Sequence, residues 1–144
     1  MAHAERTITI SAPPSEVFAF FTTPSNDQRW RAGVKDIKAE GGPRVGAVVH
    51  QTIAGPMGRG VKADIMITAY EPNTRYAFRA VEGPVRPVGS YVFTQVEGGT
   101  AVTFALSAEV AGLKKLMMGG PVQKSMEGEM AALDTAKKVL EGSG

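Results

Sequence analysis

The sequence predicts an α+β fold in which a curved, seven-stranded antiparallel sheet wraps around a long C-terminal helix. Two observations predict it. Residues 34–110 are rich in β-forming segments that alternate apolar and polar side chains between turns. The last part of the chain instead has helical apolar spacing and must cover the sheet's apolar face. The 144 residues, 43% of them hydrophobic, fit one domain spanning residues 1–144.

The N-terminal region predicts one strand. Residues 6–11 alternate, with Ile8 and Ile10 on the same face of a half-buried strand. The residues before this strand are polar, so we expect His3 to lie in a frayed tail.

Two short helices are expected after this strand. Pro14 suits the first turn of a helix, where the backbone amide has no helical partner. The apolar residues between 17 and 21 then give that helix a buried face. Residues 23–27 end it and open a second helical turn that leads to Trp30.

The β-rich region begins at Val34 and contains six strands. Glycine, proline and asparagine turns separate its segments, which include residues 45–53, 61–70, 75–81, 88–96 and 100–110. Consecutive strands joined by short turns form an antiparallel meander. In the segment 61–70 the apolar residues share one face, and Asp64 belongs to the opposite, polar face.

The C-terminal region predicts an amphipathic helix of about 20 residues. Its apolar residues, among them Met126, Met130 and Leu133, recur at steps of three and four. Pro121 either occupies the first turn of this helix or kinks a longer helix that begins near Gly112.

A cavity follows from this arrangement. One helix, about 10 Å wide, cannot fill the concave face of a strongly curved sheet. Several residues expected on that face are small: Ala47, Ala63, Ala69, Ala80 and Ala108. We therefore expect a space between sheet and helix that holds an apolar small molecule.

Short motifs along nearly the whole chain carry a family resemblance. They are Ile8-x-Ile10, Pro13-x-Ser15-Glu16-Val17-Phe18-x-Phe20, Trp30, Val45-Gly46, Tyr70-Glu71-Pro72, Tyr91-x-Phe93 and Gly98-Gly99-Thr100-x-Val102-Thr103. The chain resembles the polyketide cyclase/dehydrase branch of the START-like (SRPBCC) superfamily, which also contains birch-pollen-allergen-like and lipid-transfer proteins. The resemblance implies a helix-grip fold and an apolar ligand cavity, whereas fold alone does not settle the chemistry.

The residues expected to line this cavity are aromatic, aliphatic or small, with one amide among them. They are Trp30, Val49, Gln51, Ala63, Ile65, Tyr76, Phe78, Tyr91, Phe93, Phe104, Met117, Met126 and Met130. Gln51 needs a partner on an apolar wall, which a ligand group or an ordered water would supply. A tyrosine hydroxyl, first that of Tyr91 and then that of Tyr76, could donate a hydrogen bond or act as an acid. The alternative is a hydroxyl that reaches the surface or binds a backbone carbonyl.

Four further residues have a functional and a structural interpretation. Trp30 either lines the mouth of the cavity or packs between helix and sheet, and we expect packing. Arg29 and Arg31 could bind a carboxylate or a carbonyl, but we expect both to be solvated. We expect His50 to have a structural or surface role rather than to act as a general base.

Composition excludes several classes of function. The chain has no cysteine, which removes thiolate catalysis and disulfides, and its histidines and carboxylates show no metal-ligand spacing. We expect no metal and no cofactor. A net charge of +2 does not indicate a nucleic-acid partner. No apolar run is long enough for membrane insertion and the N-terminus has no signal-peptide pattern, so we expect a cytoplasmic protein, either monomer or homodimer.

Three functions remain open. The leading hypothesis is binding or transport of a hydrophobic or amphipathic small molecule, lipid-like or polyketide-like. The first alternative is a cyclase or dehydratase acting on an aromatic or polyketide substrate, which a buried acid–base pair with perturbed pKa would favour. The second alternative is a protein-interaction module, which a contiguous exposed apolar patch would favour.

Overall fold

The fold is described from a computed structural model of the chain. The description covers residues 2–31, 33–39, 44–54, 60–81, 86–108 and 113–142, and the side chains of residues 113–122 are left out of it.

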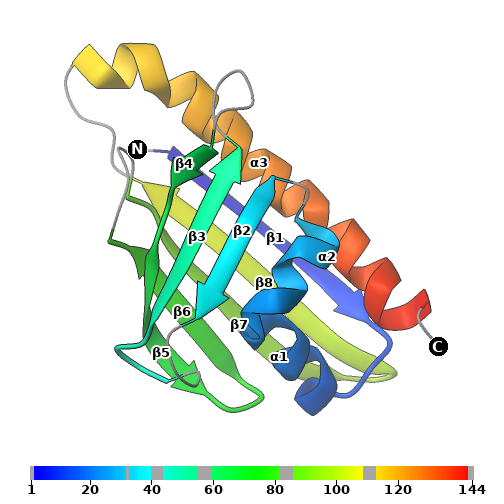
Figure 1. The fold of residues 1–144 in the computed structure, drawn as a ribbon. Helices are drawn as coiled ribbons and strands as arrows, with labels where there is room; N and C mark the ends of the chain where they lie inside the picture. The colour runs from blue at the N-terminus through cyan, green and yellow to red at the C-terminus, as the bar shows by residue number, and fades with distance from the viewer. Residues whose placement is uncertain are drawn as a thin grey trace.

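The elements follow the order expected for a helix-grip fold. They are β1 (Ala2–Ile10), α1 (Pro14–Thr22), the 3₁₀ helix η1 (Pro24–Asn26), α2 (Asp27–Trp30), β2 (Val34–Ala39), β3 (Val48–Ala54), β4 (Gly60–Lys62), β5 (Ile65–Glu71), β6 (Arg75–Ala80), β7 (Val88–Val96), β8 (Gly99–Ala108) and α3 (Leu113–Gly142). Seven strands form an antiparallel path in the order β1-β8-β7-β6-β5-β3-β2, and the short β4 pairs with β3 off that path. Figure 1 shows the sheet curled beside α3, with α1 and α2 near the C-terminal half of that helix. The predicted curved sheet, short helices and long C-terminal helix are confirmed.

Strict alternation in β8 explains where the core lies. Val102, Phe104 and Leu106 are buried, and the residues between them are only half-buried. Because alternate side chains of a strand point to opposite faces, these three residues share the inner face that packs against the helices. The inner residues of β1, β6 and β7 continue the same buried layer.

The hairpin between β7 and β8 depends on two glycines. Gly98 has a φ of +84°, which a residue without a Cβ adopts at little cost. At Gly99 a Cβ would overlap the carbonyl oxygen of Ile10, so this glycine lets the end of β1 lie against the hairpin.

The expectation of a frayed N-terminal tail is wrong. His3 lies within β1, which pairs with β8 along its whole length. Its backbone nitrogen donates to Gln123 Oε1 at 2.9 Å, and Gln123 Nε2 donates to the His3 carbonyl at 2.6 Å. The tail is ordered because both the sheet and α3 satisfy its backbone groups.

The expected strand 61–70 is broken in two. β4 ends at Lys62 and β5 begins at Ile65, and Asp64 between them is buried rather than exposed on a polar face. The Asp64 carboxylate forms a hydrogen bond with His50 Nδ1 at 2.7 Å and accepts one from the backbone nitrogen of Gln51 at 3.2 Å. A buried carboxylate must find such partners, and here they lie on β3, which explains the interruption of regular pairing.

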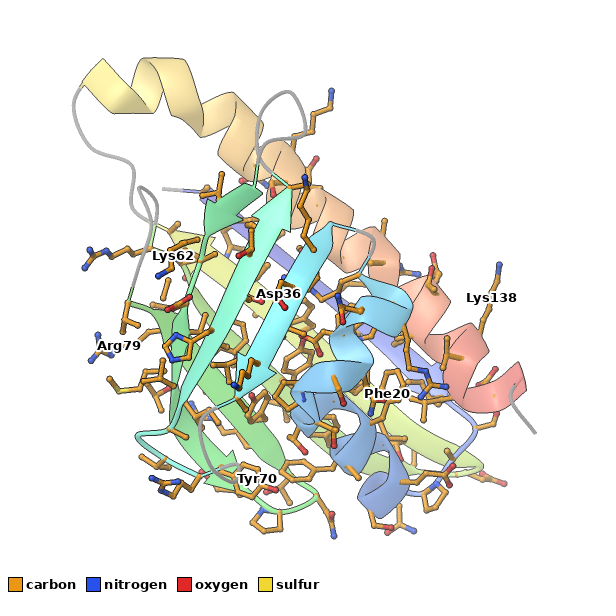
Figure 2. The ribbon with its side chains drawn as sticks, in the orientation of Figure 1. Phe20, Asp36, Lys62, Tyr70, Arg79 and Lys138 are labelled. Atoms are coloured by element: carbon orange, nitrogen blue, oxygen red, sulfur yellow. The ribbon has the colours of Figure 1, made fainter. Side chains whose placement is uncertain are left out.

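The C-terminal helix is one element of 30 residues that continues through Pro121. The expectation of one longer helix that includes Pro121 is therefore confirmed, whereas the expected length of about 20 residues is wrong. From residue 123 onward the side chains on its buried face are Met126, Met130, Leu133 and Ala136. Figure 2 shows Lys138 projecting away from the opposite side of α3, and Lys62 and Arg79 projecting away from the sheet.

Truncating the buried face of α3 tests this packing. Leu133 is 0% exposed, so Leu133→Ala removes a fully buried side chain and leaves a cavity. We expect a loss of about 2–5 kcal/mol in the free energy of unfolding, measured by chemical denaturation. Lys138→Ala on the exposed face is the control, with an expected change within about 0.5 kcal/mol. Equal effects of the two changes would contradict this placement of α3.

Candidate functional site

The structure places most of the predicted cavity residues on the inner side of the sheet or on the helices facing it. Those that are buried are Trp30, Val49, Gln51, Tyr76, Tyr91, Phe93, Phe104, Met126 and Met130. Ala63, Ile65 and Phe78 are half-buried. The side chain of Met117 lies outside the described residues. Their role in binding a ligand stays a prediction.

An aromatic cluster fills one part of this inner face. The ring of Tyr91 stacks on Phe104 with centroids 4.3 Å apart, and Tyr76 lies 6.0 Å from Tyr91 on the next strand. The ring centroid of Phe21, on α1, lies 5.1 Å from that of Tyr91 and 5.4 Å from that of Trp30. Trp30, only 3% exposed, therefore packs between helix and sheet, which is the role expected for it.

The hydroxyls of Tyr76 and Tyr91 make no hydrogen bond with any of the described residues. In the described part of the chain, the one fully enclosed side-chain nitrogen or oxygen without a partner is Trp30 Nε1. Both tyrosines are buried, with 5% of each residue exposed. Burial and, secondarily, the nearby Asp27 charge raise the pKa of both tyrosines well above its usual value, so both hydroxyls remain neutral.

Three charged side chains join α2 to α3 beside these tyrosines. Arg31 follows α2 and donates from Nε and Nη2 to Glu129 of α3, at 2.8 Å and 3.2 Å. Its Nη1 donates to Asp27 at 2.9 Å. The side chains of Arg31 and Asp27 are each 15% exposed. The expectation of a solvated arginine is wrong at position 31, because two carboxylates hold the guanidinium in a mostly buried position. We call Asp27, Arg31 and Glu129 the charged triad.

The carboxyl group of Asp27 has a perturbed pKa. Burial raises it from 3.8 to about 6, Arg31 opposes this shift, and the nearby Glu129 charge reinforces it. Trp30 Nε1 lies near enough to lower the pKa of Asp27 slightly, without reaching hydrogen-bond geometry. The protonation state of Asp27 therefore changes within the physiological range of pH.

Gln51 connects the charged triad to the sheet. Its Oε1 accepts from Arg31 Nη1 at 3.3 Å, and its Nε2 donates to the carbonyl of Ala63 at 2.8 Å. The sequence interpretation required a ligand or a water to satisfy this amide, but protein groups satisfy it instead. Gln51 thus holds the segment between β4 and β5 next to the triad.

His50 lies on the opposite face of β3 and has the structural role expected for it. Its Nδ1 forms a hydrogen bond with the carboxylate of Asp64, in which the carboxylate is 8% exposed and the imidazole 43% exposed. Burial acts to raise the pKa of Asp64, but hydrogen bonds from His50 and from the Gln51 backbone outweigh it and hold the pKa below its usual value. The pair keeps Asp64 ionised where the sheet is interrupted.

An open hollow of about 290 Å³ lies away from the sheet, between helices. Its wall is formed by α1, the η1–α2 segment and the last turns of α3, and includes Phe20, Arg29, Val139 and Leu140. Arg29 lies 5.6 Å from the centroid of the Phe20 ring and donates to Asn26. Sequence analysis did not anticipate this hollow, because its walls come from distant segments.

Sequence analysis also missed Asp27 and Glu129. One signal was present: Asp27 and Arg31 have the i, i+4 spacing of a helical ion pair. Nothing comparable indicates Glu129, which lies 98 residues from Arg31 along the chain.

Two further properties concern the described residues. No group of three or more histidine and carboxylate side chains gathers there in a way that could hold a metal ion. None of their helices is both long and apolar enough to cross a membrane.

Comparison with known proteins gives a family and a fold. A family model described as "Polyketide cyclase / dehydrase and lipid transport" matches residues 1–141, and no curated protein matches the chain. The protein TTHA0849 from Thermus thermophilus is 22% identical, with 96% of this chain and 95% of that chain covered and a TM-score of 0.77. A START superfamily protein from Mycobacterium smegmatis is 11% identical over 97% and 99%, with a TM-score of 0.77. Ara h 8.0201 is 17% identical over 94% and 96%, with a TM-score of 0.66. At these identities the three structures show a shared fold.

The pH dependence of stability tests the environment of Asp27. Because its pKa is higher in the folded state than the usual 3.8, the folded state binds a proton that the unfolded state lacks between about pH 4 and 6. Stability due to this group therefore rises as pH falls from 6 to 4, by at most about 2–3 kcal/mol. Unfolding free energies of wild type and Asp27→Asn measured across this range should show the rise in wild type alone. The exposed variant Asp134→Asn is the control and should keep the rise; its loss there would contradict the assignment.

Proposed function

The chain belongs to the polyketide cyclase/dehydrase and lipid transport family, and on that premise we propose that it binds a hydrophobic or amphipathic small molecule between the sheet and α3. One observation carries the proposal: two tyrosine hydroxyls without a protein partner among the described residues lie on a largely apolar inner wall. Small-molecule sites commonly combine apolar walls with a few convergent polar groups. In this proposal the wall binds the body of the ligand, and Tyr76 and Tyr91 bind its polar end.

The half-buried residues indicate where the body of the ligand lies. Ile65 pairs with Val49 and Ala80, and all three belong to the inner wall. Phe78 lies one strand further, and Gly89 makes room for its ring, because a Cβ there would overlap with it. Ile65 and Phe78 are half-buried, whereas the neighbouring aromatic residues are buried. We assign the apolar end of the ligand to this part of the wall.

The direct test is native mass spectrometry of the purified protein, followed by organic extraction of any bound molecule. We expect an apolar or amphipathic compound to co-purify with wild type. Ile65→Trp should abolish or strongly reduce this adduct, because the indole occupies the proposed space. The control is Thr68→Trp, at an exposed position of the same strand, which should keep the adduct. An adduct equally present in both variants would contradict the proposed location.

The polar end of the site is tested with 2-naphthol and naphthalene, which differ by one hydroxyl. In wild type we expect 2-naphthol to bind about five- to tenfold more tightly, as one hydrogen bond of about 1 kcal/mol implies. Tyr91→Phe should reduce this preference while leaving the affinity for naphthalene nearly unchanged. Calorimetric titration measures both constants. A preference that survives in Tyr91→Phe and in Tyr76→Phe would show that other groups bind the hydroxyl.

A second function, acid–base catalysis, is favoured by one observation. Asp27 has a pKa of about 6 and lies near the neutral hydroxyl of Tyr91, which fits a general base beside a hydrogen-bond donor. Such a pair would remove the α-proton of a bound ketone to Asp27 and stabilise the enolate oxygen through Tyr91. Deuterium exchange of 2-tetralone, followed by NMR, tests this. We expect catalysed exchange that rises through about pH 6 and is lost in Asp27→Asn; exchange at the buffer rate would leave binding as the function.

A further inference from the structure

We propose that the interior site selects uncharged ligands and excludes anionic ones, because the charged triad carries surplus negative charge beside the ligand's polar end. The proposal rests on the binding function above and specifies its ligand class: an apolar molecule whose polar end is a hydroxyl or carbonyl, rather than a carboxylate, sulfonate or phosphate.

The charge of the triad is the first step. Asp27 and Glu129 supply two carboxylates, and Arg31 supplies one guanidinium. Among the described residues, Arg31 is the one cation that pairs with both carboxylates. With all three groups ionised the triad has a net charge of −1.

The second step is that Arg31 is already engaged. Nε and Nη2 each donate to Glu129, and Nη1 donates to both Asp27 and Gln51, which makes four hydrogen bonds. A guanidinium has five N–H groups, so one at most remains for any ligand. Binding an anion here would require breaking a partly buried ion pair, which is costly because it leaves a carboxylate unpaired.

Neutral groups of the sheet lie beside the triad. Gln51 of β3 accepts a hydrogen bond from Arg31, and the Asp27 charge acts on Tyr76 of β6 and Tyr91 of β7, where it helps to keep both hydroxyls protonated. A neutral hydroxyl can donate to or accept from an uncharged oxygen of a ligand. An anion would accept the same hydrogen bond but would also meet the repulsion of the triad in a poorly solvated place.

The test uses two fluorescent probes with the same aromatic body. N-phenyl-1-naphthylamine is uncharged, and 8-anilino-1-naphthalenesulfonate carries an additional sulfonate. At about pH 8 we expect wild type to bind the uncharged probe at least about tenfold more tightly. Equal affinities, or tighter binding of the sulfonate, would overturn the proposal. Failure of both probes to bind, together with the absence of a co-purified molecule, would instead count against the proposed binding function.

A variant and a pH series identify the source of the selectivity. Asp27→Asn removes the surplus charge, so the preference for the uncharged probe should fall at least about threefold. The exposed variant Asp134→Asn should keep the wild-type ratio. In wild type the ratio should also fall as pH drops from about 8 to about 5, because Asp27 becomes protonated while the sulfonate stays ionised. The pH series does not depend on the folding of any variant. If the ratio of the two affinities stays constant with pH and is unchanged in Asp27→Asn, the triad is not the cause of the selectivity.

Discussion

The inner architecture depends on the hydrogen bonds and ion pairs that the Arg31 guanidinium makes. This guanidinium binds Glu129 of α3, Asp27 of α2 and Gln51 of β3, and so fixes two helices and the sheet at one place. Gln51 extends this connection to the carbonyl of Ala63, next to the interruption between β4 and β5. Removing a group of this kind leaves buried charges without partners, which costs more than the pair itself contributes.

The inner face has two parts that differ in exposure. On one side the rings of Phe21, Trp30, Tyr91 and Phe104 pack against each other in close contact. Further along the wall, Ile65 and Phe78 remain half-buried. The tyrosine hydroxyls lie beside the triad and meet no protein partner among the described residues. A ligand with an apolar body and an uncharged polar end matches this division.

The fold could be predicted from the sequence because its determinants are periodic. The alternation around Phe104 and the helical spacing of Met126, Met130 and Leu133 each identify a buried face. The charged triad could not be predicted in the same way, because Arg31 and Glu129 come together only when the helices pack against the sheet. The break at Asp64 also escaped prediction, since alternation cannot show which polar residue finds buried partners.

We propose that a ligand binds between the sheet and α3, and methyl NMR of methionine tests this proposal most directly. Met126 and Met130 lie on the buried face of α3, whereas Met66 pairs with Arg79 and Val48 at a position that alternates with the inner residues Ile65 and Ile67. On titration with N-phenyl-1-naphthylamine we expect the methyl signals of Met126 and Met130 to shift and that of Met66 to stay. Shifts confined to Met66, or binding without any change at the α3 methionines, would place the ligand elsewhere and contradict the account.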